Sequence, residues 1–76
     1  MKLSEGIPEK SYIVEEMLLP VSLEKRLEVL GMTKETPVNI INRKGHGILI
    51  ISVRGTRLAL GKNITKNITV RDFNEQ

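Results

Sequence analysis

The sequence predicts a small, mainly β domain with one short α-helix, and three observations support this prediction. Apolar, β-branched segments recur along the chain between glycine-containing turns, which is typical of an antiparallel sheet. One stretch, residues 22–32, instead carries leucines at helical spacing. The chain has 76 residues and no cysteine, so we expect one domain over residues 1–76 without a disulfide framework.

Five segments are expected to form strands. Each is rich in β-branched or aliphatic residues and is bounded by turn-forming residues: 12–17, 37–43, 48–54, 56–60 and 67–73. The three middle segments follow one another with only short glycine turns between them, which indicates an antiparallel meander. A tight helical turn is expected just before the last strand.

The predicted helix is expected to cover an open end of the β structure. Ser22 is predicted to cap its N-terminus, and Gly31 to end it in a left-handed conformation. Acidic residues flank its two basic residues, which disfavours insertion into a nucleic-acid groove. We therefore predict a structural plug, made by the leucine stripe and the residues that end the helix: Leu23, Leu27, Leu30, Gly31 and Met32.

The sequence offers little for catalysis or metal binding. It has one histidine, His46, one aspartate, Asp72, and no cysteine nucleophile. Glu15 and Glu16 are adjacent in a predicted strand, so their side chains point to opposite faces and do not form a carboxylate pair. We expect no catalytic residue, no metal site and no cofactor, and we expect that the protein is not an enzyme.

Charge is divided unevenly along the chain. The formal net charge is +3, with −2 on residues 1–41 and +5 on residues 42–76. A basic half is compatible with nucleic-acid binding, but the chain has only two aromatic residues to stack on bases, Tyr12 and Phe73. Nucleic acid is therefore the least favoured partner. No signal peptide or membrane-spanning segment is predicted, so we expect a cytoplasmic protein that meets a membrane only through a partner.

Strand alternation predicts an apolar patch on the outer face of the meander. Pairing Ile40 with Ile51 and Ile41 with Ile50 keeps the faces in phase and leaves residues 44–47 as a four-residue loop. The outward isoleucines then form either a contact surface or a patch covered by the amino-terminal segment or the helix. The predicted partner-binding set, with its basic rim, is Ile41, Arg43, Ile48, Ile50 and Arg54.

Several of these segments together resemble the FeoA family of small cytosolic proteins associated with bacterial ferrous-iron uptake. The similar segments are RLEVLGM (26–32), GILIISVRG (47–55), RLALG (57–61) and ITKNITV (64–70), with the opening residues 1–14. The resemblance implies a small SH3-like β-barrel with the helix packed at one end. It also implies a partner, the cytosolic GTPase domain of the membrane ferrous-iron transporter FeoB, and an accessory rather than an enzymatic role.

The same module also resembles the carboxyl-terminal domain of DtxR-type metal-dependent repressors, so the fold does not decide the role. The alternative is a regulatory or self-associating module of another system, including a homo-oligomer formed through the isoleucine patch or by strand addition at a sheet edge. The chain also departs from the FeoA pattern. Lys34-Glu35 replaces a frequent Pro-Gly, and Gly45-His46-Gly47 lacks the proline common in the central hairpin, so these loops are expected to differ.

Overall fold

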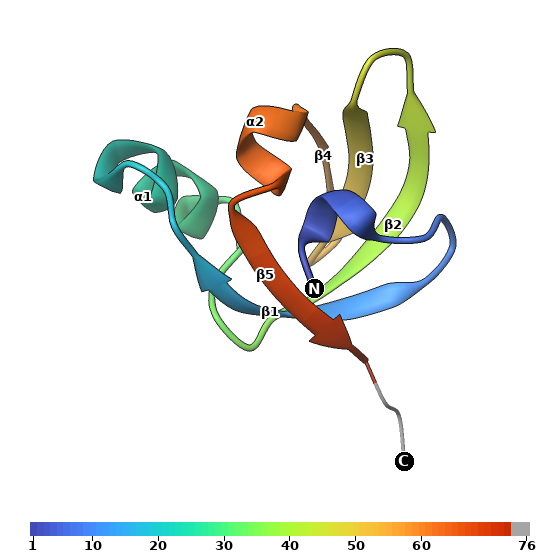
Figure 1. Ribbon diagram of the computed structural model, residues 1–76. Coiled ribbons are helices and arrows are strands. Elements are labelled where there is room, and N and C mark those ends of the chain that lie inside the picture. The colour runs from blue at the N-terminus through green and yellow to red at the C-terminus, as the bar shows by residue number, and fades with distance from the viewer. Residues whose placement is uncertain (74–76) are drawn as a thin grey trace.

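Five antiparallel strands form a single sheet in the computed structural model, which describes residues 1–73 (Figure 1). In chain order the strands are β1 (Ser11–Met17), β2 (Pro37–Lys44), β3 (Ile48–Val53), β4 (Thr56–Leu60) and β5 (Ile68–Asp72). The other elements are the 3-10 turn η1 (Leu3–Glu5), the helix α1 (Val21–Val29) and the short helix α2 (Lys62–Thr65). The predicted mainly β fold is confirmed.

The strand order β4-β3-β2-β1-β5 contains the predicted meander of β2, β3 and β4 and places the last strand, β5, beside the first, β1. The start of β1 pairs with β2, and β1 also pairs along its length with β5, so one strand joins the two halves of a small barrel-like sheet. β4 and β5 lie at opposite ends of this order and are not paired. Leu3 of η1 and Thr65 of α2 are buried beside this opening, where the two short elements contact each other.

Alternate residues of the strands form the core. Leu49, Ile51 and Val53 are buried on β3, and Val38 and Ile40 are buried on β2. The inward face predicted from the two-residue period is therefore confirmed for both strands. Side chains from β1 and β5 complete the core: Tyr12, Val14, Met17, Ile68 and Val70.

The predicted register of the β2–β3 hairpin is right at one end and wrong at the other. Ile40 does pair with Ile51, but Ile50 pairs with Asn42 rather than with Ile41. The cause is an irregularity between Ile40 and Asn42 that inserts one extra residue into β2, as a β-bulge does. The turn is consequently three residues, 45–47, rather than four, and its two glycines have positive φ angles.

Helix α1 begins two residues before the predicted position and ends where predicted. Pro20, not Ser22, is the N-cap residue, and it makes no side-chain capping bond. Gly31 has a φ of +101° and donates its amide to the Glu28 carbonyl at 2.9 Å. The Met32 amide reaches back to the Leu27 carbonyl at 2.9 Å, which completes a Schellman motif.

The residues of the predicted plug take different positions. Leu27 and Met32 are buried in the core, and Leu23 packs against it while half-buried. Leu30 is 42% exposed, so its predicted place in the plug is wrong. α1 lies beside the sheet (Figure 1), and the chain reverses at Gly31. Met32 is therefore buried in the core, in the role that the leucine stripe predicted for Leu30.

Candidate protein-interaction surface

The isoleucine patch predicted from strand parity is smaller than expected. Ile48 is 38% exposed, but Ile41 and Ile50 are only half-buried, and Asn42 lies opposite Ile50 in the register. Ala59 lies opposite Ile50 on the other side, so the outer face of the meander carries a narrow apolar strip. This strip is interrupted by a polar side chain because the bulge in β2 places Asn42 in the row.

Arg43 does not line this strip. The bulge places it opposite Leu49, and its Nη2 atom donates to the carbonyl oxygens of Ser4 at 2.8 Å and Gly6 at 2.6 Å. The predicted outward orientation of Arg43 is therefore wrong. A charged donor that satisfies two main-chain carbonyls holds the amino-terminal segment against the end of the hairpin.

Arg54 is also engaged within the molecule. It forms the two-residue β3–β4 turn with Gly55, and both residues have positive φ angles, +50° and +80°, as a type I′ turn requires. Its Nε atom donates to the Gly31 carbonyl at 3.1 Å. An ideal Cβ placed on Gly31 would lie 2.7 Å from the Arg54 Cδ, so the two residues are in close contact. Arg54 thus ties the β3–β4 turn to the end of α1.

A more exposed apolar surface lies on α1. Val29 is 86% exposed, and together with Leu30 and Arg26 it lines a shallow depression. We call these three residues the α1 surface. Val21 and Leu18 are also exposed, near the start of the helix. An apolar depression with an arginine at its side has the composition that protein-interaction sites favour.

Sequence reasoning missed the α1 surface, although a signal was present. Val21, Lys25 and Val29 follow at intervals of four, on a row outside the leucine stripe. Two valines on a helix row expected to face water are unusual, because β-branched residues neither favour helices nor gain from exposure. The exposure of Leu30 depends on how α1 lies against the sheet. The spacing of the leucines does not determine that orientation.

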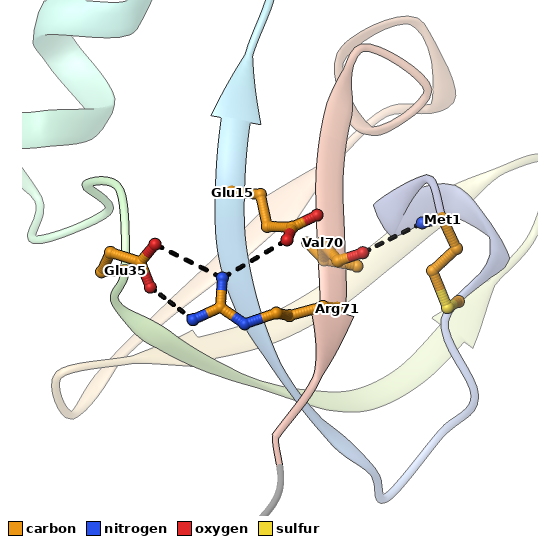
Figure 2. Close-up of polar contacts among 5 residues, drawn as sticks. All are labelled: Met1, Glu15, Glu35, Val70 and Arg71. Carbon is orange, nitrogen blue, oxygen red and sulfur yellow. Dashed lines mark hydrogen bonds and ion pairs between the residues drawn. The ribbon is translucent and has the colours of Figure 1, made fainter.

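Strand β5 carries a group of ionic contacts around Arg71 (Figure 2). Arg71 of β5 lies between two carboxylates, with Nη2 2.5 Å from an oxygen of Glu35 and Nη1 3.4 Å from an oxygen of Glu15. The hydrogen bond from Arg71, and secondarily its charge, lowers the pKa of the Glu35 carboxyl below its usual value. All three side chains are substantially exposed, so the group contributes little stability.

The same contacts explain one departure from the FeoA pattern. Glu35 has a φ of +65°, a conformation that favours glycine. It stands at the position where the FeoA pattern frequently has a glycine. Its amide donates to the Val14 carbonyl at 2.7 Å, and its carboxylate binds Arg71. These bonds stabilise a conformation that a non-glycine residue would otherwise disfavour.

Potential metal ligands are not grouped in the part of the chain that the structure describes. Within residues 1–73 there is no group of three or more His, Cys, Asp or Glu side chains placed to hold a metal ion. His46 is exposed in the β2–β3 turn. No helix in the described part of the chain is long and apolar enough to cross a membrane.

Comparisons with known proteins find relatives that match nearly the whole chain. A family model described as the FeoA domain matches residues 1–72. The chain is 30% identical to a FeoA described as an iron uptake regulatory protein, with a TM-score of 0.84 and coverage of 96% of this chain and 97% of that one. It is 31% identical to a Stenotrophomonas maltophilia FeoA solved with zinc and described as a prokaryotic SH3 domain protein, with a TM-score of 0.77 and coverage of 92% and 88%.

A manganese-dependent transcriptional repressor has the same fold at 12% identity, with a TM-score of 0.84. The chain covers 41% of that repressor, while 96% of this chain is aligned. This likeness shows the fold alone. No match was found among curated protein sequences.

Proposed function

Because the chain belongs to the FeoA domain family, we propose that it is a non-enzymatic accessory protein of bacterial ferrous-iron uptake that binds the cytosolic GTPase domain of a FeoB-type transporter. The family match spans residues 1–72, and the chain aligns along nearly its whole length with a 30% identical iron uptake regulatory protein. An activating role in ferrous-iron transport has been suggested for the S. maltophilia relative. These similarities support a role in regulating transport.

The contact with the GTPase domain is assigned to the α1 surface, and the exposure of Val29 is the observation that carries this assignment. An 86% exposed valine beside Leu30 and Arg26 leaves apolar area in water that a partner would bury. Arginine is enriched at protein interfaces, where it contributes both apolar stem and charge. Arg43 and Arg54, by contrast, already donate to main-chain carbonyls of their own chain.

The originally predicted set around Ile48 and Ile50 is kept as the competing contact surface. Its apolar strip is exposed mainly at Ile48, and it lies on the meander rather than on α1. The two surfaces can be tested separately, because Val29 and Ile48 belong to different elements and neither is part of the buried core.

The test is a calorimetric titration of the full chain into the soluble GTPase domain of the ferrous-iron transporter from the same organism. Val29→Asp should weaken binding at least about tenfold, since it places a desolvated charge in an apolar contact. Val21→Asp is the matched control, because it adds the same charge to the same helix outside the depression. Ile48→Asp should leave the affinity within about twofold of wild type.

Three outcomes decide the assignment. Loss of binding in Val29→Asp alone supports the α1 surface. Loss in Ile48→Asp alone retains the partner and moves the contact to the meander. Absence of binding by a correctly folded wild type contradicts the proposed partner.

A further inference from the structure

In the described part of the chain, strand β4 has a neighbouring strand on one side only. It is the terminal strand of the sheet order, and its register with β3 places Val53 opposite Thr56 across a two-residue turn. The pair that closes such a turn is hydrogen-bonded, so the backbone groups of Arg57 and Ala59 point away from β3. Among residues 1–73, no backbone hydrogen bond from outside the β3–β4 ladder reaches residues 56–60.

The opposite end of the sheet is already covered. The Met1 amine donates to the Val70 carbonyl at 3.0 Å (Figure 2), and the Val70 amide donates to the Met1 carbonyl at 2.8 Å. Lys2 forms a β-bridge with Thr69 next to this pair. The amino-terminal residues thus pair with the outer edge of β5 at Thr69 and Val70, whereas β4 has no such partner among the described residues.

Leu58, in the middle of β4, is incompletely covered. It lies opposite Ile51, which is fully buried, so its side chain is on the core face of the sheet. Leu58 nevertheless remains only partly buried, although it packs against the core. A strand added beside β4 would cover this side chain and satisfy the backbone groups on either side of it.

We propose that two copies of the chain pair through their β4 strands, antiparallel about a two-fold axis at Leu58. The register follows from the free backbone groups: Arg57 of one copy hydrogen-bonds with Ala59 of the other, and the symmetric pair repeats this contact. The long Arg57 side chain of one copy then lies opposite the small Ala59 side chain of the other, and the two Leu58 side chains lie opposite each other. Because Met1 and Lys2 already pair with Val70 and Thr69, a head-to-tail contact between β4 of one copy and β5 of another is disfavoured. Symmetric pairing of β4 with β4 uses both free edges at once, so association closes at a dimer and does not grow into a ring or fibre.

The dimer is expected to be weak and to strengthen with salt. Only three residues of each β4 take part, which is a small contact compared with a stable protein interface. Both Arg57 side chains lie on the outer face, opposite Ser52 within their own chains, and each copy carries a formal charge of +3. Ionic screening of these like charges should therefore lower the dimer dissociation constant.

The first experiment is sedimentation equilibrium of the full chain up to millimolar concentration, comparing Ala59→Pro with Ala59→Ser. Proline removes the Ala59 amide that faces the free edge, where proline is tolerated, and leaves the bonds to β3 intact. Two intermolecular bonds are lost per dimer, so the dissociation constant should rise about 30-fold. Ala59→Ser keeps the amide and should associate like wild type. Circular dichroism of each variant verifies that the fold is retained.

A second experiment locates the axis. The chain has no cysteine, so a single Leu58→Cys introduces the only thiol. Two copies of residue 58 would be a non-hydrogen-bonded pair about 4.5 Å apart at Cα, within reach of a disulfide under mild oxidation. Ser52→Cys, on the outer face of β3, should not cross-link.

Efficient cross-linking at residue 58, together with weakened association of Ala59→Pro, supports the pairing. A wild type that stays monomeric at all concentrations overturns it, as does a dimer that Ala59→Pro leaves unchanged. If the wild type is monomeric but Ala59→Pro loses affinity for the GTPase domain, the edge belongs to a partner strand and the dimer is likewise overturned. The proposal uses β4 and not the α1 surface, so it stands or falls separately from the transporter assignment.

Discussion

Replacing Leu27 by alanine tests how α1 is attached to the sheet. Leu27 is 3% exposed and packs in the core, whereas Leu30, the C-cap residue of the same helix, is 42% exposed. The same substitution at both positions removes the same atoms and leaves helix propensity nearly equal. Only the environment of the side chain differs, so the two variants form a matched pair.

The expected magnitudes follow from burial. Removing a buried leucine side chain costs its transfer free energy plus the cavity that remains, about 3 kcal/mol for Leu27 within the usual range of 2–5. A domain of this length has a free energy of unfolding of roughly 4–11 kcal/mol, so this loss is a large part of the total. The melting temperature should fall by about 12–24 °C. Leu30→Ala should cost no more than about 1 kcal/mol, because much of its side chain is already in water.

The assay is urea unfolding followed by circular dichroism, with the chain dilute enough to be monomeric. Equal slopes for wild type and both variants would show that the change lies in the stability of the native state. Equal losses for Leu27→Ala and Leu30→Ala, or a larger loss for Leu30→Ala, would refute the described orientation of α1. That result would also remove the reason for regarding Leu30 as part of an exposed contact surface.

The remaining predictions concern backbone conformation and pH. Gly31→Ala should lower the free energy of unfolding by at least about 1–2 kcal/mol, because it strains a φ of +101° and displaces Arg54. Gly45→Ala, at φ +53° with no atom within 4 Å of the new Cβ, should cost less in the same urea assay. Glu35→Gln should remove a small stabilisation that is present above about pH 4.5 and disappears as the pH falls through the lowered pKa of Glu35 in the folded state. Urea midpoints that differ between wild type and Glu35→Gln at pH 7 but converge once the pH is below the lowered pKa of Glu35 would agree with this, whereas a difference independent of pH would exclude Arg71 as its source.

The parts of the fold that follow from short-range pattern were predictable. The two-residue period placed Leu49, Ile51 and Val53 on the core face, and the structure buries all three. The position of Gly31 after the last helical turn predicted the left-handed end of α1, and its φ is +101°. In each case a few neighbouring residues contain the information, because strand alternation and helix termination are local properties.

The β2–β3 register past Ile40 was not predictable in the same way. A bulge adds one residue to a strand without changing composition, and nothing in the sequence of β2 distinguishes Ile41 as that residue. This error in the predicted register also gave Arg43 the wrong orientation. In the structure Arg43 binds the carbonyls of Ser4 and Gly6, nearly 40 residues earlier in the chain. The candidate site changed for a related reason, because the exposure of Val29 depends on how the whole helix lies beside the sheet.

The most direct test of the account is to map where the GTPase domain touches this chain. Isotope-labelled full chain would be titrated with the soluble GTPase domain of the transporter, and backbone amide shifts followed by NMR. The account predicts that the largest changes fall on residues 26–30, at the end of α1, and that the outer face of β3 at Ile48 and Ile50 is spared. Changes confined to β3, or none at concentrations where the GTPase domain is in excess, would contradict it.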